Sequence, residues 1–238
     1  MQRDSLRLFR FAGIEVYLHF SWFLIAFYQF TMRSHGYSSP VFALYEYIAL
    51  FVIVLLHEFG HAFATRQVGG MANYILLWPF GGIAFVRAPE RPGAQLWSIV
   101  AGPLVNVVLI PVLWLMLLLA AQSGLARTAP DSYQLLYMVG RINLLILIFN
   151  LLPVYPLDGG QILRSLLWYP FGRIRSLQVA SVIGLLGGGV FLLLAFRWRS
   201  ILLGIMTLFL ISQAFAGWQH ARALRTQETE VAPRPPVL

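Results

Sequence analysis

Apolar residues occur in long runs that are separated by short polar or Gly/Pro-containing segments. A helix needs about 20 mostly apolar residues to cross about 30 Å of hydrocarbon. Six segments meet this criterion, namely 15–32, 41–65, 96–121, 133–152, 177–196 and 200–217. The pattern therefore predicts an all-α polytopic membrane protein with six transmembrane helices.

The segment 74–86, between the second and third spans, has a different pattern. It is apolar, but it is too short for a span and is broken by Pro79, Gly81 and Gly82. Such a segment is typical of a β-hairpin or re-entrant loop that turns at the two glycines. Non-helical backbone at membrane depth must be covered by protein or by a water-filled cavity. We therefore expect a short membrane-associated β-hairpin that packs against the helices.

Composition supports a membrane protein. The 238 residues are 59% hydrophobic and 11% charged, with a mean hydropathy of +0.73, whereas soluble domains carry about 25% charged residues. The chain has no cysteine, which excludes disulfides and thiolate metal ligands. The net charge of +8 comes entirely from arginine. These arginines are scattered between apolar spans rather than clustered, so we predict no nucleic-acid partner and interpret them as orientation signals.

The arginines also predict an orientation. With the N-terminus inside, only Arg33, Arg127, Arg197 and Arg199 fall clearly on the outer side. The positive-inside rule then places both termini in the cytoplasm. Residues 1–225 are expected to form a single membrane domain. The polar, proline-rich segment 226–238 is expected to be a disordered cytoplasmic tail.

The strongest chemical signal is His57-Glu58-Phe59-Gly60-His61, which closes the apolar run 47–56. Residues four apart share one helical face, so both imidazoles can reach one metal ion with Glu58 beside it. Ionisable side chains in hydrocarbon cost at least about 2.5–3.5 kcal/mol each, and three together indicate a function. This pattern favours a zinc site near the cytoplasmic end of the second span. The alternative is a pair of histidines whose polar atoms are satisfied by neighbouring helices.

A third metal ligand can be sought by elimination. Zinc held by two histidines commonly takes a carboxylate and leaves one position open for water. Besides Glu58, only Glu46 and Asp158 lie in or against the apolar spans. Glu46 lies about three turns before His57, too far along the helix to reach the same ion. Asp158 is therefore the candidate, although an aspartate at this position could simply cap a helix.

The residues around Asp158 suit a ligand that must be aimed at a neighbouring helix. Pro153 and Pro156 break the fourth span, and Gly159 with Gly160 allows the backbone to approach closely.

Two motifs of this chain have counterparts in a known family. The motifs HEFGH (57–61) and NLLPVYPLDGG (150–160) resemble the two signatures of the site-2 protease family of intramembrane metalloproteases. The segments AGPLVN (101–106) and PFGGI (79–83) also fit the family pattern. The resemblance extends from the second span through Gln161.

The resemblance implies one Zn²⁺ per chain, bound by His57, His61 and Asp158, with Glu58 as the catalytic base. It also implies that Asn150 holds the substrate backbone near the metal. The hairpin around Gly81 and Gly82 would offer its edge to an unwound substrate helix. Further residues are candidates for a supporting role, namely Asn106, Pro153 and Gly159. For several of these a structural role stays open: Asn150 and Asn106 could bond or pack between helices, and the glycines could only make a turn.

The expected function is that of an intramembrane zinc endopeptidase. It would hydrolyse peptide bonds within or near transmembrane segments of single-span proteins such as anti-sigma factors, membrane-tethered regulators or signal-peptide remnants. The expected location is a bacterial or archaeal plasma membrane, with the active site toward the cytoplasm. Family members often carry PDZ or CBS domains, and neither fits this sequence, so we expect a compact form.

Two other classes of function are alternatives. A metal transporter should have ligands on both sides of the membrane midplane, but this sequence offers one cluster near one face. A catalytically inactive relative is disfavoured because Glu58 is intact.

Overall fold

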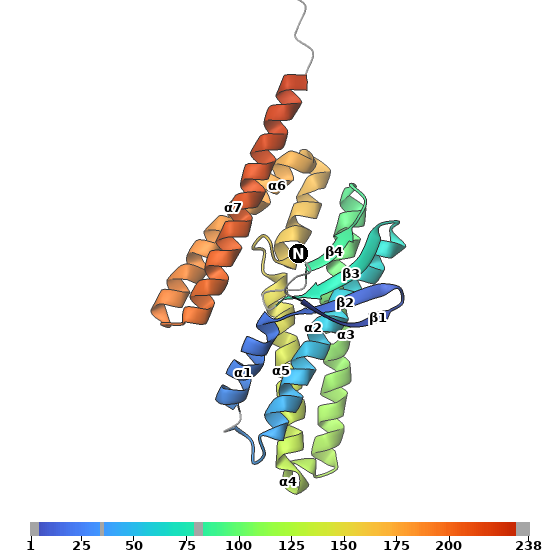
Figure 1. The fold of residues 1–238 in the computed structure, drawn as a ribbon, viewed down its shortest axis with the longest axis vertical. Helices are drawn as coiled ribbons and strands as arrows, with labels where there is room; N and C mark the ends of the chain where they lie inside the picture. Colours follow the sequence, from blue (N-terminus) through green and yellow to red (C-terminus); the bar gives the residue numbers. More distant parts are fainter. Residues whose placement is uncertain (1–4, 34–35, 79–82, 232–238) are drawn as a thin grey trace, which may run out of the picture. The chain divides into compact units, whose positions relative to one another are not determined.

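A computed structural model describes residues 5–33, 36–78 and 83–231 of the chain (Figure 1). The chain forms two compact units, Met1–Phe149 and Asn150–Leu238, and each is described by itself.

The first unit begins with two strands and a short helix: β1 (Ser5–Phe11), β2 (Ile14–His19) and α1 (Ser21–Arg33). The predicted first span, 15–32, is therefore wrong in its first part. In β2, buried residues alternate with half-buried ones, which is the period of a strand. The strand and the helix follow each other in one nearly continuous apolar run, so the run resembles a single span. The 13 residues of α1 extend only about 20 Å, too short to cross a bilayer.

Two further strands, β3 (Met71–Leu77) and β4 (Ile83–Arg87), join β1 and β2 in one four-stranded sheet. The strand order is β1-β2-β3-β4, and Figure 1 shows the four strands side by side. The outer pairs, β1–β2 and β3–β4, are antiparallel, whereas β2 and β3 are parallel. The segment expected as a separate hairpin thus belongs to a larger sheet. Gly81 and Gly82, where the turn was predicted, lie outside the described residues, and the membrane depth of the segment stays a prediction.

The sheet packs against α2 (Val41–Gln67). Ile14, Val16, Ile75 and Leu77 form a buried cluster with Phe59 of α2 and neighbouring residues. This apolar contact fixes α2 on the sheet, because burying such side chains contributes roughly 1.5–3 kcal/mol each.

Arg66, in the last turn of α2, ties the helix to the sheet. Its Nε donates a 3.0 Å hydrogen bond to the carbonyl oxygen of Ala72 at the start of β3. Its Nη2 donates a 3.2 Å bond to the carbonyl oxygen of Gly13 in the β1–β2 turn. The guanidinium group of Arg66 therefore links the end of α2 both to β3 and to the β1–β2 turn.

The first unit is completed by α3 (Pro92–Gln122), the short α4 (Leu125–Thr128) and α5 (Pro130–Leu151), which continues into the second unit.

Glu46 in α2 is buried and accepts hydrogen bonds from Arg33 Nε at 3.0 Å and from the Tyr37 hydroxyl at 2.6 Å. Arg141 of α5 is exposed, with its guanidinium carbon 5.8 Å from the ring centroid of Tyr137.

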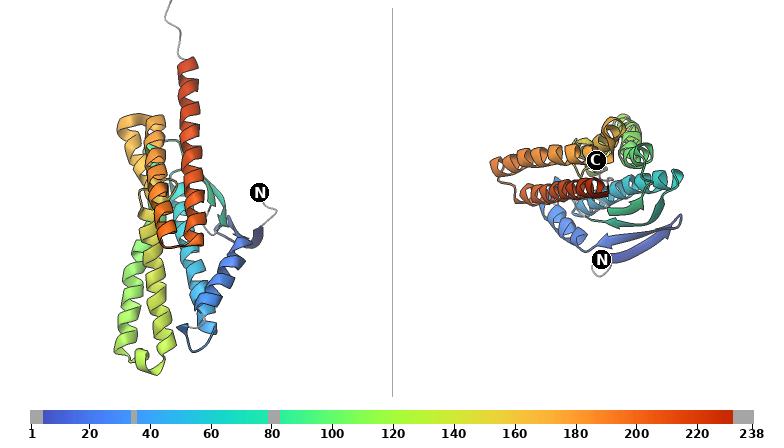
Figure 2. Two further views of the ribbon diagram at one scale, coloured as in Figure 1. Left: turned by 90° about the vertical axis from the view of Figure 1, so that its left-hand side faces the viewer. Right: turned by 90° about the horizontal axis from the view of Figure 1, so that it is seen from above.

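The second unit contains α6 (Asp158–Arg197) and α7 (Ile201–Val231). Two helical parts of α6 meet at Gly172, where φ is +77°, a conformation that glycine adopts readily. The second part of α6 and α7 lie side by side in both views of Figure 2. Because α7 is helical to Val231, the first six residues of the expected disordered tail, 226–231, are helical. Residues 232–238 lie outside the described residues.

In the described part of the chain, five helices are long and apolar enough to cross a membrane: α2, α3, α5, α6 and α7 up to Gln227. The count differs from the predicted six because the first predicted span is a strand followed by a short helix.

Candidate metal centre

Three predicted site residues lie close together on α2. The ligand atoms of His57, Glu58 and His61 lie within 4.8 Å of one another. The side chains are only 3%, 5% and 8% exposed, respectively. The apolar run before them contains neither glycine nor proline, so α2 continues without interruption into the motif. A 3.6-residue turn brings His57 and His61 to the same face.

The backbone of α3 determines the tautomer of His61. The ring atom Nδ1 lies 2.9 Å from the carbonyl oxygen of Ser98. A carbonyl oxygen can only accept a hydrogen bond, so Nδ1 of the neutral ring must carry the proton. The other ring nitrogen, Nε2, then carries the lone pair that a metal requires.

The tautomer of His57 follows from two buried asparagines. Asn143 donates from Nδ2 to the backbone oxygen of Asn106 at 3.0 Å, which identifies the amide orientation of Asn143. Its Oδ1 therefore accepts the 2.8 Å bond from Nδ2 of Asn106. This leaves Oδ1 of Asn106 facing Nδ1 of His57 at 2.6 Å. The His57 ring must donate from Nδ1 and carries its lone pair on Nε2.

The two Nε2 atoms lie 3.0 Å apart. With both protons on Nδ1, these atoms cannot hydrogen-bond to each other, and a cation between them would remove the repulsion of their lone pairs. Two nitrogen ligands of a tetrahedral zinc ion at 2.0–2.1 Å lie about 3.3 Å apart. The donor set and its spacing therefore fit zinc, and the cluster could hold one such ion.

Gly102 of α3 makes room for His61. A Cβ atom at this position would overlap the His61 imidazole. On the other side of the contact, a Cβ at Gly60 would lie 2.6 Å from the carbonyl oxygen of Ala101. The close approach of α2 and α3 at the site thus depends on glycine at both positions.

Sequence reasoning missed three of these residues, namely Ser98, Gly102 and Asn143, as parts of the site. Gly102 was noted only as part of a family motif. The amide of Asn143, inside the apolar fourth span, was the available signal, since a polar side chain in a membrane helix requires a partner. Ser98 acts through its backbone, which no side-chain pattern reveals.

Four further predicted residues belong to the second unit. Asp158 begins α6 and is half-buried, as is Asn150, while Pro153 is exposed. Gly159 is buried where a Cβ would overlap the carbonyl oxygens of Leu151 and Leu152. All four belong to the second unit, so their contribution to the histidine cluster stays a prediction.

Comparison with known proteins identifies relatives of the whole chain. The family model "Peptidase family M50" matches residues 45–132 and 121–196. A zinc metalloprotease of Methanocaldococcus jannaschii is 32% identical over 225 residues, which is 94% of this chain and 62% of that protein. Stage IV sporulation protein FB of Bacillus subtilis is 31% identical over 72% of this chain and 53% of that protein. The chain therefore spans only about half to three fifths of the length of these curated relatives.

A solved structure shows the same fold. The site-2 protease from Methanocaldococcus jannaschii aligns with a TM-score of 0.65 and 28% sequence identity. The alignment covers 98% of this chain and 99% of that chain.

Proposed function

The chain belongs to peptidase family M50, and on this basis we propose that it is an intramembrane zinc endopeptidase. Its reaction is the hydrolysis of peptide bonds within or near transmembrane segments of other membrane proteins. One observation carries the proposal: His57, Glu58 and His61 lie together in a buried cluster in which the Nε2 atoms of the two imidazoles are 3.0 Å apart.

His57 and His61 supply two of the metal ligands, and Asp158 supplies the third. A zinc ion held there would lower the pKa of water toward about 7 and polarise the scissile carbonyl group. Asp158 suits this role because it stands at the beginning of α6, where the chain re-enters a helix after Pro153 and Pro156. The fourth position is left for water and substrate.

Glu58 acts as the general base. Its carboxylate takes a proton from the attacking water and later gives it to the nitrogen of the leaving amine. Such a positioned acid–base group contributes roughly 10²–10⁴-fold to the rate. The burial of Glu58 favours this role, because burial limits competing solvent around the carboxylate.

The free edge of β4 is proposed to bind the substrate. In the described sheet β4 pairs with β3 on one side and is the last strand in the order. A substrate helix must unwind before its peptide bonds can be attacked, and the exposed backbone then needs hydrogen-bond partners. Addition of the unwound segment to β4 would provide them. We assign Asn150 to the same task, beside the metal, and Gly81 and Gly82 to the turn of the hairpin.

The substrates proposed are single-span membrane proteins, for example anti-sigma factors, membrane-tethered regulators or signal-peptide remnants. The active site is placed toward the cytoplasm, and both termini lie there. The support for this orientation is the excess of arginine in the connections on that side.

The test is Glu58→Gln in the full chain, reconstituted in lipid vesicles with a single-span substrate protein. Zinc should remain bound, because both histidines are intact, while cleavage of the substrate falls by at least about 10²-fold. Glu90→Gln, at an exposed position before α3, is the matched control and should cleave normally. Retained cleavage in Glu58→Gln would contradict the proposal. Metal flux across the vesicle that persists in this variant would favour a transporter instead.

A further inference from the structure

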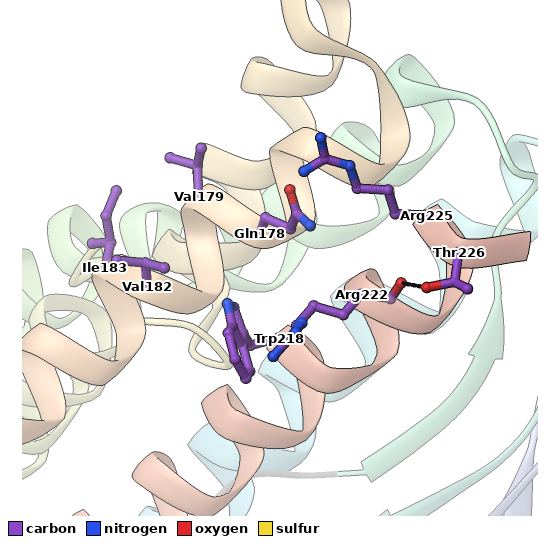
Figure 3. Close-up of a pocket in the computed structure, with 8 residues that line it drawn as sticks. All are labelled: Gln178, Val179, Val182, Ile183, Trp218, Arg222, Arg225 and Thr226. Atoms are coloured by element: carbon purple, nitrogen blue, oxygen red, sulfur yellow. Dashed lines mark hydrogen bonds between the residues drawn. The ribbon is translucent and has the colours of Figure 1, made fainter. Parts of the chain in front are cut away.

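A groove of about 700 Å³ lies in the second unit, between the second part of α6 and α7 (Figure 3). Its α6 wall contains Val179, Val182 and Ile183, and its α7 wall contains Trp218, Arg222 and Arg225. The volume is in the range of about 300–1,000 Å³ typical of small-molecule sites. One end of the groove is basic and the rest is mainly apolar.

The basic end is formed by two arginines on one face of α7. Arg222 and Arg225 are three residues apart, so their side chains are neighbours. The Arg222 guanidinium carbon lies 4.7 Å from the ring centroid of Trp218, and this cation–π contact positions it. Figure 3 shows Arg225 extending from α7 toward α6. Paired guanidinium groups are well suited to phosphate, since each offers several N–H donors in a planar fork.

The residues that line the groove include no acidic residue. From Gly159 to Gln227, which includes both walls of the groove, the chain contains no Asp or Glu, and Glu228 and Glu230 follow at the end of α7. The connection before the second part of α6 adds Arg173 and Arg175. The electrostatic potential of this segment therefore favours an anionic ligand.

Exposed apolar residues continue along α6 beyond the groove. Val179, Val182, Leu186 and Val190 are spaced three or four residues apart, so they lie on one helical face. All four are exposed, Leu186 by 68% and Val190 by 58%. This stripe is about as long as several turns of helix and starts beside the two arginines. An extended hydrocarbon chain can follow it.

Trp218 marks the level at which this polarity changes. On its N-terminal side α7 is apolar from Ile201, and on its C-terminal side the helix carries Arg222 and Arg225. Tryptophan is enriched at membrane–water interfaces, with its ring at the level of the lipid headgroups. Both α6 and α7 are long and apolar enough to cross a membrane. The basic end of the groove is thus at headgroup level and the apolar stripe at acyl-chain level.

We propose that this groove binds an anionic phospholipid of the surrounding bilayer. The lipid phosphate contacts Arg222 and Arg225, and one acyl chain lies along the stripe from Val179 to Val190. Basic pockets between transmembrane helices are a known mode of headgroup recognition. The site lies entirely within the second unit and does not depend on the proposed proteolysis.

The test uses the full-length chain in vesicles of phosphatidylcholine that contain either brominated phosphatidylglycerol or brominated phosphatidylcholine. Bromine quenches nearby tryptophan, and the contribution of Trp218 is the difference between the wild type and Trp218→Phe. We expect stronger Trp218 quenching by the brominated phosphatidylglycerol. In Arg222→Gln/Arg225→Gln this preference should fall by at least about tenfold, because each arginine near the surface contributes a factor of about five.

The matched control is Arg197→Gln/Arg199→Gln, which removes two exposed arginines from the other end of the same helix pair. This variant should keep the preference for phosphatidylglycerol. An equal loss in both variants, or no preference in the wild type, would overturn the proposal. Excess inorganic phosphate should leave the quenching unchanged, and displacement of the lipid by phosphate would show a free-anion site instead. If the double variant does not fold, the test is the difference in Trp218 quenching between brominated phosphatidylglycerol and brominated phosphatidylcholine in the wild type.

Discussion

The Nδ2 atom of Asn106 lies 2.8 Å from the Oδ1 atom of Asn143, and this contact sets the orientation of the amide that holds His57. If the Asn106 amide were reversed, its Nδ2 would face Nδ1 of His57 and donate a hydrogen bond to it. The His57 lone pair would then lie on Nδ1, and Nε2 would carry the proton. Asn143 is thus a positioning residue that acts on the metal ligand through one intermediate side chain.

We first predict that Asn143→Leu weakens zinc binding by about 10–100-fold, the usual effect of losing a residue that orients a ligand. Leucine has a similar volume but cannot accept from Asn106 Nδ2. The measurement is the zinc dissociation constant by chelator competition, with the cobalt-substituted absorption spectrum as a second readout. Thr207→Val is the control, since it removes a buried hydrogen bond in the second unit. Zinc affinity that falls equally in both variants would indicate a general loss of stability.

Gly102→Ala should prevent His61 from occupying its position, because the added methyl group would overlap the imidazole. We expect zinc content to fall to less than about a tenth of the wild-type value, in line with the sensitivity of metal sites to ligand geometry. Gly140→Ala on α5, where a Cβ meets nothing within 4 Å, is the control and should bind zinc normally. The measurement is zinc per chain after purification. Full occupancy in Gly102→Ala would refute the role given to this glycine.

Asp158→Ala should lower zinc affinity by at least about tenfold if its carboxylate is the third ligand. The comparison is with Asp131→Asn, which changes a half-buried carboxylate in the first turn of α5 that accepts a hydrogen bond from the Ser38 amide. Competition with a chelator measures both. If Asp158→Ala kept both its zinc affinity and its cleavage activity, another group would have to be the third ligand. The assignment of the two histidines as ligands would be unaffected.

Phe85→Pro tests the proposed substrate edge. This position lies in β4 where the register between β3 and β4 shifts, and proline removes a backbone donor from the strand. We expect cleavage of a single-span substrate to decrease at least severalfold while zinc content is unchanged. The corresponding change on the other edge strand, Leu8→Pro in β1, should affect cleavage less. Equal cleavage by wild type and Phe85→Pro would eliminate strand addition at β4.

Tyr37 predicts a dependence of stability on alkaline pH. Burial raises the pKa of Tyr37 above its ordinary value, and the hydrogen bond to Glu46 acts in the same direction. The folded state thus favours the neutral phenol. Its contribution is complete below the unfolded-state pKa of about 10 and is lost as pH rises through the higher folded-state pKa.

In thermal unfolding, Tyr37→Phe should be less stable than wild type at neutral pH by about 1.5–3 kcal/mol, the typical value of a hydrogen bond to a charged group. The difference should shrink above about pH 10. Tyr169→Phe, at an exposed position, serves as the control. A difference that is constant across the same pH range would contradict the assignment.

The site residues that could be predicted from the sequence are those that lie close to one another along the chain. His57, Glu58 and His61 lie within five residues of one helix, so helical periodicity alone brings them together. Gly102 reaches the same site through the packing of α3 against α2, and Asn143 through its hydrogen bonds to Asn106 of α3. Neither contact has a local pattern in the sequence. The first span failed for a different reason. In Ile14–His19 the alternation of a strand is hidden within a longer apolar run, and β2 gains its partners from β1 and from the distant β3.

The two oxygens that fix the imidazoles, the main-chain oxygen of Ser98 and the side-chain Oδ1 of Asn106, both belong to α3. Because the Ser98 oxygen is part of the helix backbone and Asn143 holds the Asn106 amide, the two rings on α2 lose their rotational freedom when the helices associate. An arriving ion then meets donors that are already aligned, and the entropy of ordering them does not reduce its affinity. Preorganisation of the centre is in this sense a product of folding.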